Sequence, residues 1–126
     1  MLFGENAFCS IFVLSTEFRK LGFIDFCNNE VESQYGFKPE DLIGKDINLI
    51  IPKMIAVVHS NLMIRFFDKA ESTVLNKVRE LFAKDRNGYL LPVYLFSKVL
   101  PSLSGGLKLV GVTKTISNLT FEPEVP

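Results

Sequence analysis

Two segments constrain the fold of this chain most. The first, Phe23–Pro52, begins with a strand pattern and continues as three short helical pieces, the first two closed by Gly36 and Gly44. The second, Arg79–Leu100, contains two strand patterns joined by Asp85–Gly88, whose Asn-Gly pair favours a tight hairpin. Helices enclosed between antiparallel strand pairs favour a sheet with helices packed on one side.

Further elements complete this arrangement. Strands are predicted over Ser10–Ser15, Val74–Lys84 and Leu107–Thr115, and a long helix is predicted over Lys53–Lys69. The pattern of Val74–Lys84 does not show which of its two faces is buried. The order of elements predicts an α+β fold, with a five-stranded antiparallel sheet and helices on one face.

The sequence predicts specific local roles for several side chains. Asn28 and Asn29 are expected to cap the first short helix, and Asp46 to cap the third. Glu40 and Asp41 are interpreted as charges favourable to a helix N-terminus rather than as catalytic carboxylates. The three tyrosines are predicted to be amphipathic rim residues: Tyr35, Tyr89 and Tyr94.

Composition limits the classes of protein and of partner. A chain of 126 residues with 48% apolar residues suits a single domain with its own core. Lys plus Arg equals Asp plus Glu, so net charge attracts neither nucleic acid nor an anionic membrane. No apolar run reaches the roughly 18 residues that span a bilayer, and the start lacks a signal-peptide pattern. Cys9 and Cys27 fit no metal spacing, so two reduced thiols and a cytoplasmic location are expected.

Five short motifs follow one another along the chain. They are Asn28 after the second strand, Gly36-Phe37, Asp41–Lys45, Leu49–Pro52, and Lys84-Asp85 followed by Gly88 and Pro92. In this order and spacing they resemble the PAS domain family. The resemblance extends from about Ser10 to Ile116, and it implies the PAS fold and a sensory or partner-binding role without catalysis. The phrases VLNK, LPSL and LVGV further resemble PAS domains of multi-pass membrane proteins from ciliates.

The resemblance divides the chain into an N-terminal extension over 1–9, a PAS domain over 10–117 and a tail over 118–126. We expect the domain to be excised from a longer protein and to contact neighbouring domains of that parent, and the narrower resemblance implies that the parent is embedded in a membrane. Leu2, Phe3 and Phe8 would form an apolar patch, which predicts a homodimer through the N-terminal segment and the outer face of the sheet.

PAS domains hold cofactors between the sheet and the helices, so the resemblance suggests two cofactors to consider, flavin and haem. Flavin photoreceptors of the LOV type carry a cysteine in the third short helix, whereas that region here, Asp46–Ile51, has none. Cys27 lies in the preceding strand and does not replace it. Thiol–flavin photochemistry is therefore not expected.

Haem is the second cofactor that the resemblance suggests. In bacterial oxygen-sensing haem PAS domains the long helix carries a proximal histidine, and an arginine twenty residues later reaches the distal side. His59 and Arg79 match this spacing, and His59 shares an apolar helical stripe with Leu62. The resulting candidate site consists of His59, Arg79, Leu62, Met63 and Leu95. The alternative is structural, with His59 as a hydrogen-bonded core residue and Arg79 paired to a surface carboxylate.

Three functions follow from these observations. The leading hypothesis is a non-enzymatic sensory or regulatory module that binds a small ligand and signals to neighbouring domains. The second is a module for protein interaction alone, with its pocket collapsed around Phe and Met side chains. The third is a small α+β enzyme, which needs an inward-facing acid with a raised pKa, and for which Asp25 and Glu80 are the candidates.

Overall fold

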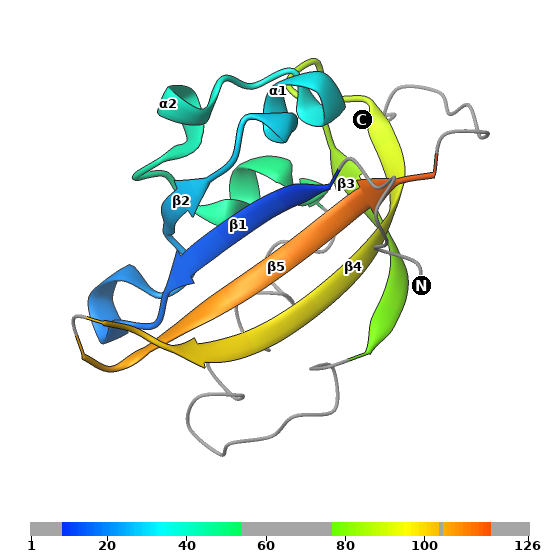
Figure 1. The fold of residues 1–126 in the computed structure, drawn as a ribbon. Coiled ribbons are helices and arrows are strands. Elements are labelled where there is room, and N and C mark those ends of the chain that lie inside the picture. Colours follow the sequence, from blue (N-terminus) through cyan, green and yellow to red (C-terminus); the bar gives the residue numbers. More distant parts are fainter. Residues whose placement is uncertain (1–8, 54–76, 104, 117–126) are drawn as a thin grey trace.

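The computed structural model describes residues 9–53, 77–103 and 105–116, and these form one antiparallel sheet with short helices (Figure 1). The strand order is β2-β1-β5-β4-β3, and every neighbouring pair is antiparallel. The strands are β1 (Ser10–Ser15), β2 (Ile24–Cys27), β3 (Val78–Lys84), β4 (Leu90–Pro101) and β5 (Leu107–Thr115). The helices are η1 (Phe18–Lys20), α1 (Glu30–Tyr35), α2 (Pro39–Leu42) and η2 (Ile47–Ile50), of which η1 and η2 are 3-10 helices. The predicted fold class is confirmed.

Most predicted boundaries agree with the structure. β1 and β5 have the expected ends, and β2 begins one residue late because Phe23 instead forms an isolated bridge with Asp46. The predicted helix over Lys53–Lys69 lies, apart from its first residue, outside the described residues. So do residues 1–8 and 117–126, and the proposed domain bounds therefore stay a prediction.

The strand register gives the sheet two distinct faces. The inner face, turned toward α1, α2 and η2, carries the buried residues of β1 together with alternate residues of the other strands. Arg79, Leu81 and Ala83 of β3 pair with Leu95, Val93 and Leu91 of β4, so all six lie on the inner face. This pairing decides the phase of β3, which its own sequence left open. The intervening residues of each strand form the outer face.

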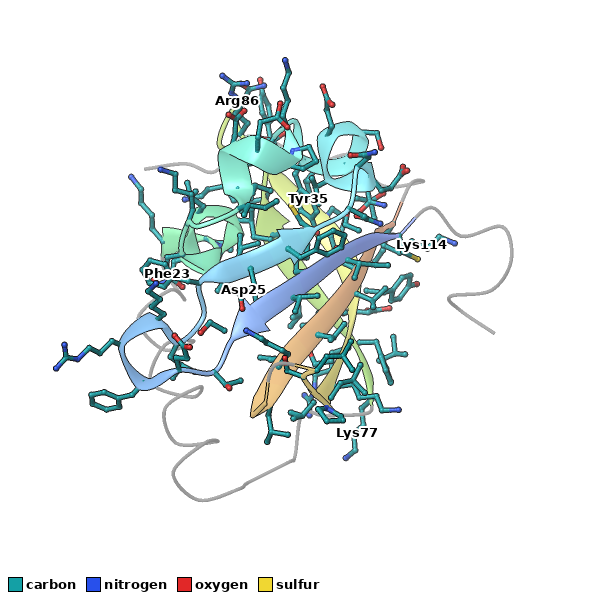
Figure 2. The ribbon with its side chains drawn as sticks, turned by 60° about the vertical axis from the view of Figure 1, so that its left-hand side comes forward. Phe23, Asp25, Tyr35, Lys77, Arg86 and Lys114 are labelled. Carbon is teal, nitrogen blue, oxygen red and sulfur yellow. The ribbon has the colours of Figure 1, made fainter. Side chains whose placement is uncertain are left out.

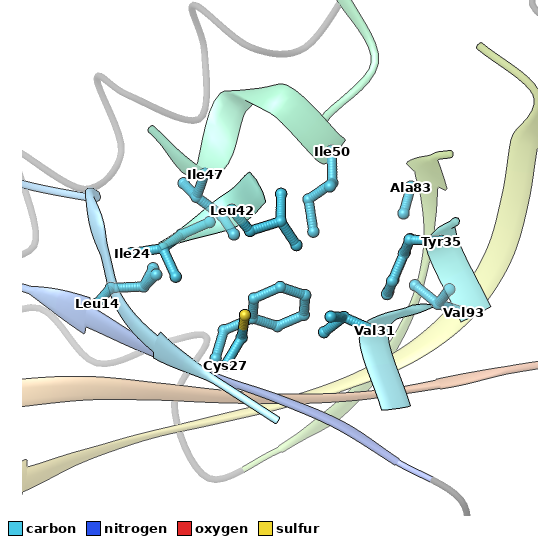
Figure 3. Packing of buried hydrophobic residues seen from close by; sticks show 11 residues of the cluster. Leu14, Ile24, Cys27, Val31, Tyr35, Leu42, Ile47, Ile50, Ala83 and Val93 are labelled. Atoms are coloured by element: carbon cyan, nitrogen blue, oxygen red, sulfur yellow. The ribbon is translucent and has the colours of Figure 1, made fainter. Parts of the chain in front are cut away.

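The core lies between the inner face and the helical segments. Figure 3 shows Leu42, Ile47 and Ile50 gathered in one cluster with Ile24 and Leu14 of the strands. Leu42 and Val31 are fully buried. The complete cluster is Phe12, Leu14, Ile24, Cys27, Val31, Tyr35, Leu42, Ile47, Ile50, Ala83 and Val93. Because all the cluster's strand residues face the same way, burial of this cluster fixes which side of the sheet is inner.

Asn28 has a different role from the one predicted. The N-cap residue of α1 is Asn29, and its side chain makes no capping hydrogen bond. The side chain of Asn28 instead accepts a hydrogen bond from Ile11 N at 3.0 Å, and its Nδ2 donates to Cys9 O at 2.9 Å. The predicted caps are therefore wrong, because Asn28 is used to join the end of β2 to the start of β1. The Asp46 cap is confirmed, since its carboxylate accepts from Asn48 N at 2.9 Å.

Gly36 ends α1 in the left-handed conformation, with φ of 82°. We expect Gly36→Ala to lower the free energy of unfolding by about 1–2 kcal/mol, because Cβ is strained at that φ. A Cβ there would also contact Arg86 Cβ at 3.5 Å. Gly111→Ala is the matched control, since Gly111 lacks a positive φ and its added Cβ would meet Leu95 Cδ1 at an ordinary 3.7 Å. Urea denaturation measures both, and equal stability of the two variants would contradict the strain.

Candidate functional site

The inner face changes from buried to exposed within two residues along β3. Ala83 is 7% exposed and belongs to the core, whereas Leu81 on the same face is 40% exposed. On β4, Val93 is buried and Leu95 is only partly buried. An apolar part of the inner face therefore lies beside the closed core, and α1, α2 and η2 do not bury it.

One row of residues across this face combines apolar and polar groups. By register, Arg79 pairs with Leu95, Leu95 with Thr113, and Thr113 with Ser10, so the row crosses β3, β4, β5 and β1. Ser10 is fully buried, and its hydroxyl donates to Gln34 Oε1 at 2.8 Å. Among the described strand residues, Arg79 is the one charged side chain on the inner face. We call Arg79, Leu81 and Leu95 the inner site.

Tyr35 connects α1 to the middle of this row. Its hydroxyl lies 2.7 Å from Thr113 Oγ1, and its ring packs edge-on against Phe12 with centroids 5.9 Å apart. Tyr35 is 1% exposed, so its predicted rim position is wrong. Burial raises the pKa of Tyr35 to about 12, although the Thr113 hydrogen bond opposes the rise. The backbone also holds α1, because Arg86 N donates to Tyr35 O at 2.9 Å. Tyr35 and Arg86 are labelled in Figure 2.

The structure places two of the five predicted site residues. Arg79 and Leu95 are direct register partners on the inner face. His59, Leu62 and Met63 lie outside the described residues, so their roles stay predictions. Sequence reasoning missed Ser10, Thr113 and Gln34, which are polar groups beside the site. For Ser10 and Thr113 the available signal was a polar residue that interrupts an otherwise apolar strand face.

The candidate acids for an enzyme lie on the other side of the sheet. Asp25 Oδ2 accepts from Lys108 Nζ at 2.6 Å in an ion pair (Asp25 is labelled in Figure 2). Glu80 pairs in register with Tyr94 on the outer face. The enzyme hypothesis requires an acid that faces the inner site, and neither of these two carboxylates does so.

The cysteines offer no reactive centre at the inner site. Cys27 is a buried free thiol within the core, where burial raises its pKa, so it stays protonated at neutral pH. The pKa of Cys9 is also raised, and burial is the largest cause.

Across residues 9–53, 77–103 and 105–116, no three His, Cys, Asp or Glu side chains gather as a metal site. The helices in these ranges include none that is long and apolar enough to cross a bilayer.

Solved structures share this architecture along most of the chain. A PAS domain from Colwellia psychrerythraea has a TM-score of 0.68 at 17% identity, covering 89% of each chain. The PAS domain of a LuxR-family transcriptional regulator from Burkholderia thailandensis, solved with ethanol, has a TM-score of 0.63 at 16% identity, covering 86% of this chain and 89% of that one. The PAS domain of the quorum-sensing receptor RpfR from Cronobacter turicensis, solved with BDSF, has a TM-score of 0.64 at 20% identity, covering 90% and 98%.

In sequence, the chain is similar to a curated protein, a probable serine/threonine-protein kinase of Dictyostelium discoideum. It is 31% identical over 84 residues, which cover 66% of this chain. The chain spans 5% of the length of that protein. No family model matches the sequence. The narrower resemblances to ciliate membrane proteins and to bacterial haem sensors stay predictions. The topology and the structural neighbours together show that this chain has the PAS fold.

Proposed function

We propose that the chain is a sensory or regulatory PAS module that binds a small ligand at the inner site and signals to neighbouring domains of a longer protein. The observation that carries this proposal is the exposed apolar surface of Leu81 and Leu95 directly beside a closed core. Apolar side chains on the core side of a sheet that remain partly exposed are typical of ligand sites. Arg79 in the same row supplies a cation.

The similar proteins support this function. Two of the PAS domains with this fold were solved with a small molecule, ethanol in one and BDSF in the other. The Dictyostelium relative is a probable protein kinase many times longer than the matched segment, which supports a module within a signalling protein.

The composition of the inner site suggests the ligand class. Leu81 and Leu95 provide apolar contacts, and a guanidinium favours a carboxylate or another acceptor. We therefore favour a small, mainly apolar molecule with one anionic or acceptor group. Such a ligand would lie along β3 and β4, whose hairpin joins α1 through the Arg86 N to Tyr35 O hydrogen bond. Ligand binding would thereby bias the position of α1 against the sheet.

A matched pair of variants tests the location of the ligand. Leu95→Trp should fill the inner site and reduce the bound small molecule at least about ten-fold, which is about 1.4 kcal/mol of binding free energy. Phe96→Trp changes the neighbouring residue of β4, which lies on the outer face, and should leave binding unchanged. Native mass spectrometry of the purified domain measures the bound fraction. Equal ligand loss in the two variants would place the ligand elsewhere.

Haem binding is a second candidate function, favoured by the position of Arg79 on the inner face. If haem binds, His59→Ala should abolish its retention, because the chain has one histidine. Arg79→Ala should retain haem and weaken oxygen binding about ten- to a hundred-fold, since a charged donor contributes about 1.5–3 kcal/mol. An absorption spectrum after addition of haemin checks this. The absence of a Soret band would exclude haem and leave the small-ligand proposal in place.

A further inference from the structure

Two turns at one end of the sheet carry apolar side chains that no part of the chain covers. Phe18, in η1, is 95% exposed, and Leu103, in the turn between β4 and β5, is fully exposed. Figure 1 shows η1, in blue, and this turn at the same end of the sheet. A single exposed apolar residue is common, whereas two that gather at one protruding end indicate a contact surface. We call Phe18, Arg19, Lys20 and Leu103 the sheet tip.

The two turns are joined, and they project by similar lengths. Thr16 Oγ1 donates to Leu107 O at 2.7 Å, and Leu107 pairs in register with Pro101 of β4. These three residues mark the end of the sheet. Phe18 lies two residues beyond Thr16, and Leu103 lies two residues beyond Pro101. Each can therefore project at most about 7 Å past the same line, so both side chains can enter one flat surface together.

The backbone of both turns pairs several of its own polar groups. In the turn between β4 and β5, Ser102 N donates to Gly106 O at 3.0 Å, and Gly105 N donates to Ser102 O at 3.1 Å. In η1, Lys20 N donates to Glu17 O at 3.0 Å. An unpaired backbone group is costly away from water. These internal hydrogen bonds therefore lower the cost of bringing the turns against an apolar phase.

Cations adjoin the exposed phenylalanine. Arg19 and Lys20 follow Phe18 directly, both are exposed, and neither forms an ion pair within the described part of the chain. Glu17, the N-cap residue of η1, offsets one of these charges, which leaves one cation in excess on this turn. The whole chain has equal numbers of cations and anions, so the excess is local.

We infer that the sheet tip inserts into the surface of an anionic lipid bilayer. Phe18 and Leu103 would lie at the boundary between headgroups and acyl chains, with the two cations among the headgroups. Aromatic and aliphatic side chains beside Arg and Lys are the composition that binds at this boundary. A fluid bilayer accommodates two separate protruding side chains, whereas a protein partner would need two matching pockets. Because the net charge of the chain is zero, insertion supplies most of the affinity and the cations supply the preference for anionic lipid.

A fluorescent residue tests the insertion directly, because the chain has no tryptophan. The emission of Phe18→Trp should move to shorter wavelength when vesicles of phosphatidylcholine with about one third phosphatidylserine are added. Brominated lipids in the same vesicles should quench this emission. Ile43→Trp is the matched control, since Ile43 is 42% exposed and lies just after α2, away from the sheet tip. It should show neither change.

Vesicle sedimentation separates the apolar contribution from the charged one. F18S/L103S should lower the partition coefficient at least about ten-fold and leave the thermal melt unchanged, because both side chains are exposed. R19E/K20E should remove the preference for anionic over neutral vesicles, which we expect to be about five-fold in the wild type. K38E, which reverses an exposed charge beside α2, should retain that preference.

Several results would overturn the inference. These are no binding of the wild type to the anionic vesicles, equal quenching in Phe18→Trp and Ile43→Trp, or unchanged binding of F18S/L103S. A stable dimer in sedimentation velocity that Phe18→Ser dissociates would assign the sheet tip to a second copy instead. None of these readouts depends on ligand occupancy at the inner site, which native mass spectrometry measures separately.

Discussion

Replacing Tyr35 with alanine should lower the free energy of unfolding by about 3–5 kcal/mol, a large fraction of the stability of a small domain. The side chain is 1% exposed, so its removal leaves a cavity between α1 and the sheet. It also removes the edge-on contact with Phe12 and leaves Thr113 Oγ1 without this hydrogen bond. Urea denaturation followed by circular dichroism measures the loss. A loss below about 1 kcal/mol would show that the ring does not hold α1 in place.

Tyr35→Phe separates the hydroxyl from the ring. This variant keeps the packing and should cost about 1–2 kcal/mol, because one buried hydrogen bond to Thr113 is lost. Thr113→Val removes the same hydrogen bond from its other end. In a double-mutant cycle the two losses should not add, since they report one interaction.

The pH dependence of Tyr35→Phe gives an independent check. Folding raises the pKa of Tyr35 to about 12, against about 10 for an unfolded tyrosine. The folded state therefore binds the proton more tightly, and this contribution is present below pH about 10 and lost as pH rises toward 12. The stability difference between wild type and Tyr35→Phe should narrow across that window. A constant difference would contradict burial of the neutral hydroxyl.

Asn28→Ala should destabilise the domain by about 1–3 kcal/mol, because two backbone groups lose their partner. Ile11 N and Cys9 O both bond to this one side chain. Asn29→Ala is the matched control, since Asn29 is exposed and its side chain caps nothing. Its expected effect is within about 0.5 kcal/mol. Thermal melts of the two variants measure the contrast, and the reverse order of stability would restore the capping role predicted from the sequence.

The two asparagines show where sequence reasoning is limited. Capping is a local rule, and either residue satisfied it. The hydrogen bonds of Asn28 go instead to residues 17 and 19 positions away, which only the pairing of β1 with β2 brings close. Tyr35 was misplaced for the same reason. A tyrosine can be fully buried when its hydroxyl has a partner, and Thr113 is 78 residues distant.

The periodic patterns were more reliable. The ends of β1 and β5 were predicted correctly, and Leu91, Val93, Leu95 and Val99 share one face, because alternation is a property of each strand alone. β3 has mixed residues on both faces, so its phase required the register with β4. That register is also what placed Arg79 beside Leu95. Two of the three inner-site residues, Arg79 and Leu95, were thus predictable in identity, while their geometry required the fold.

The central claim is that a small molecule binds on the inner face rather than on the outer one. Methyl NMR tests it most directly, by comparing the domain freed of small molecules with the domain after its extracted ligand is returned. The methyl signals of Leu81 and Leu95 should shift, while those of Val110 and Val112 on the outer face should not. Shifts confined to Val110 and Val112, or none at Leu81 and Leu95, would contradict the proposed ligand site.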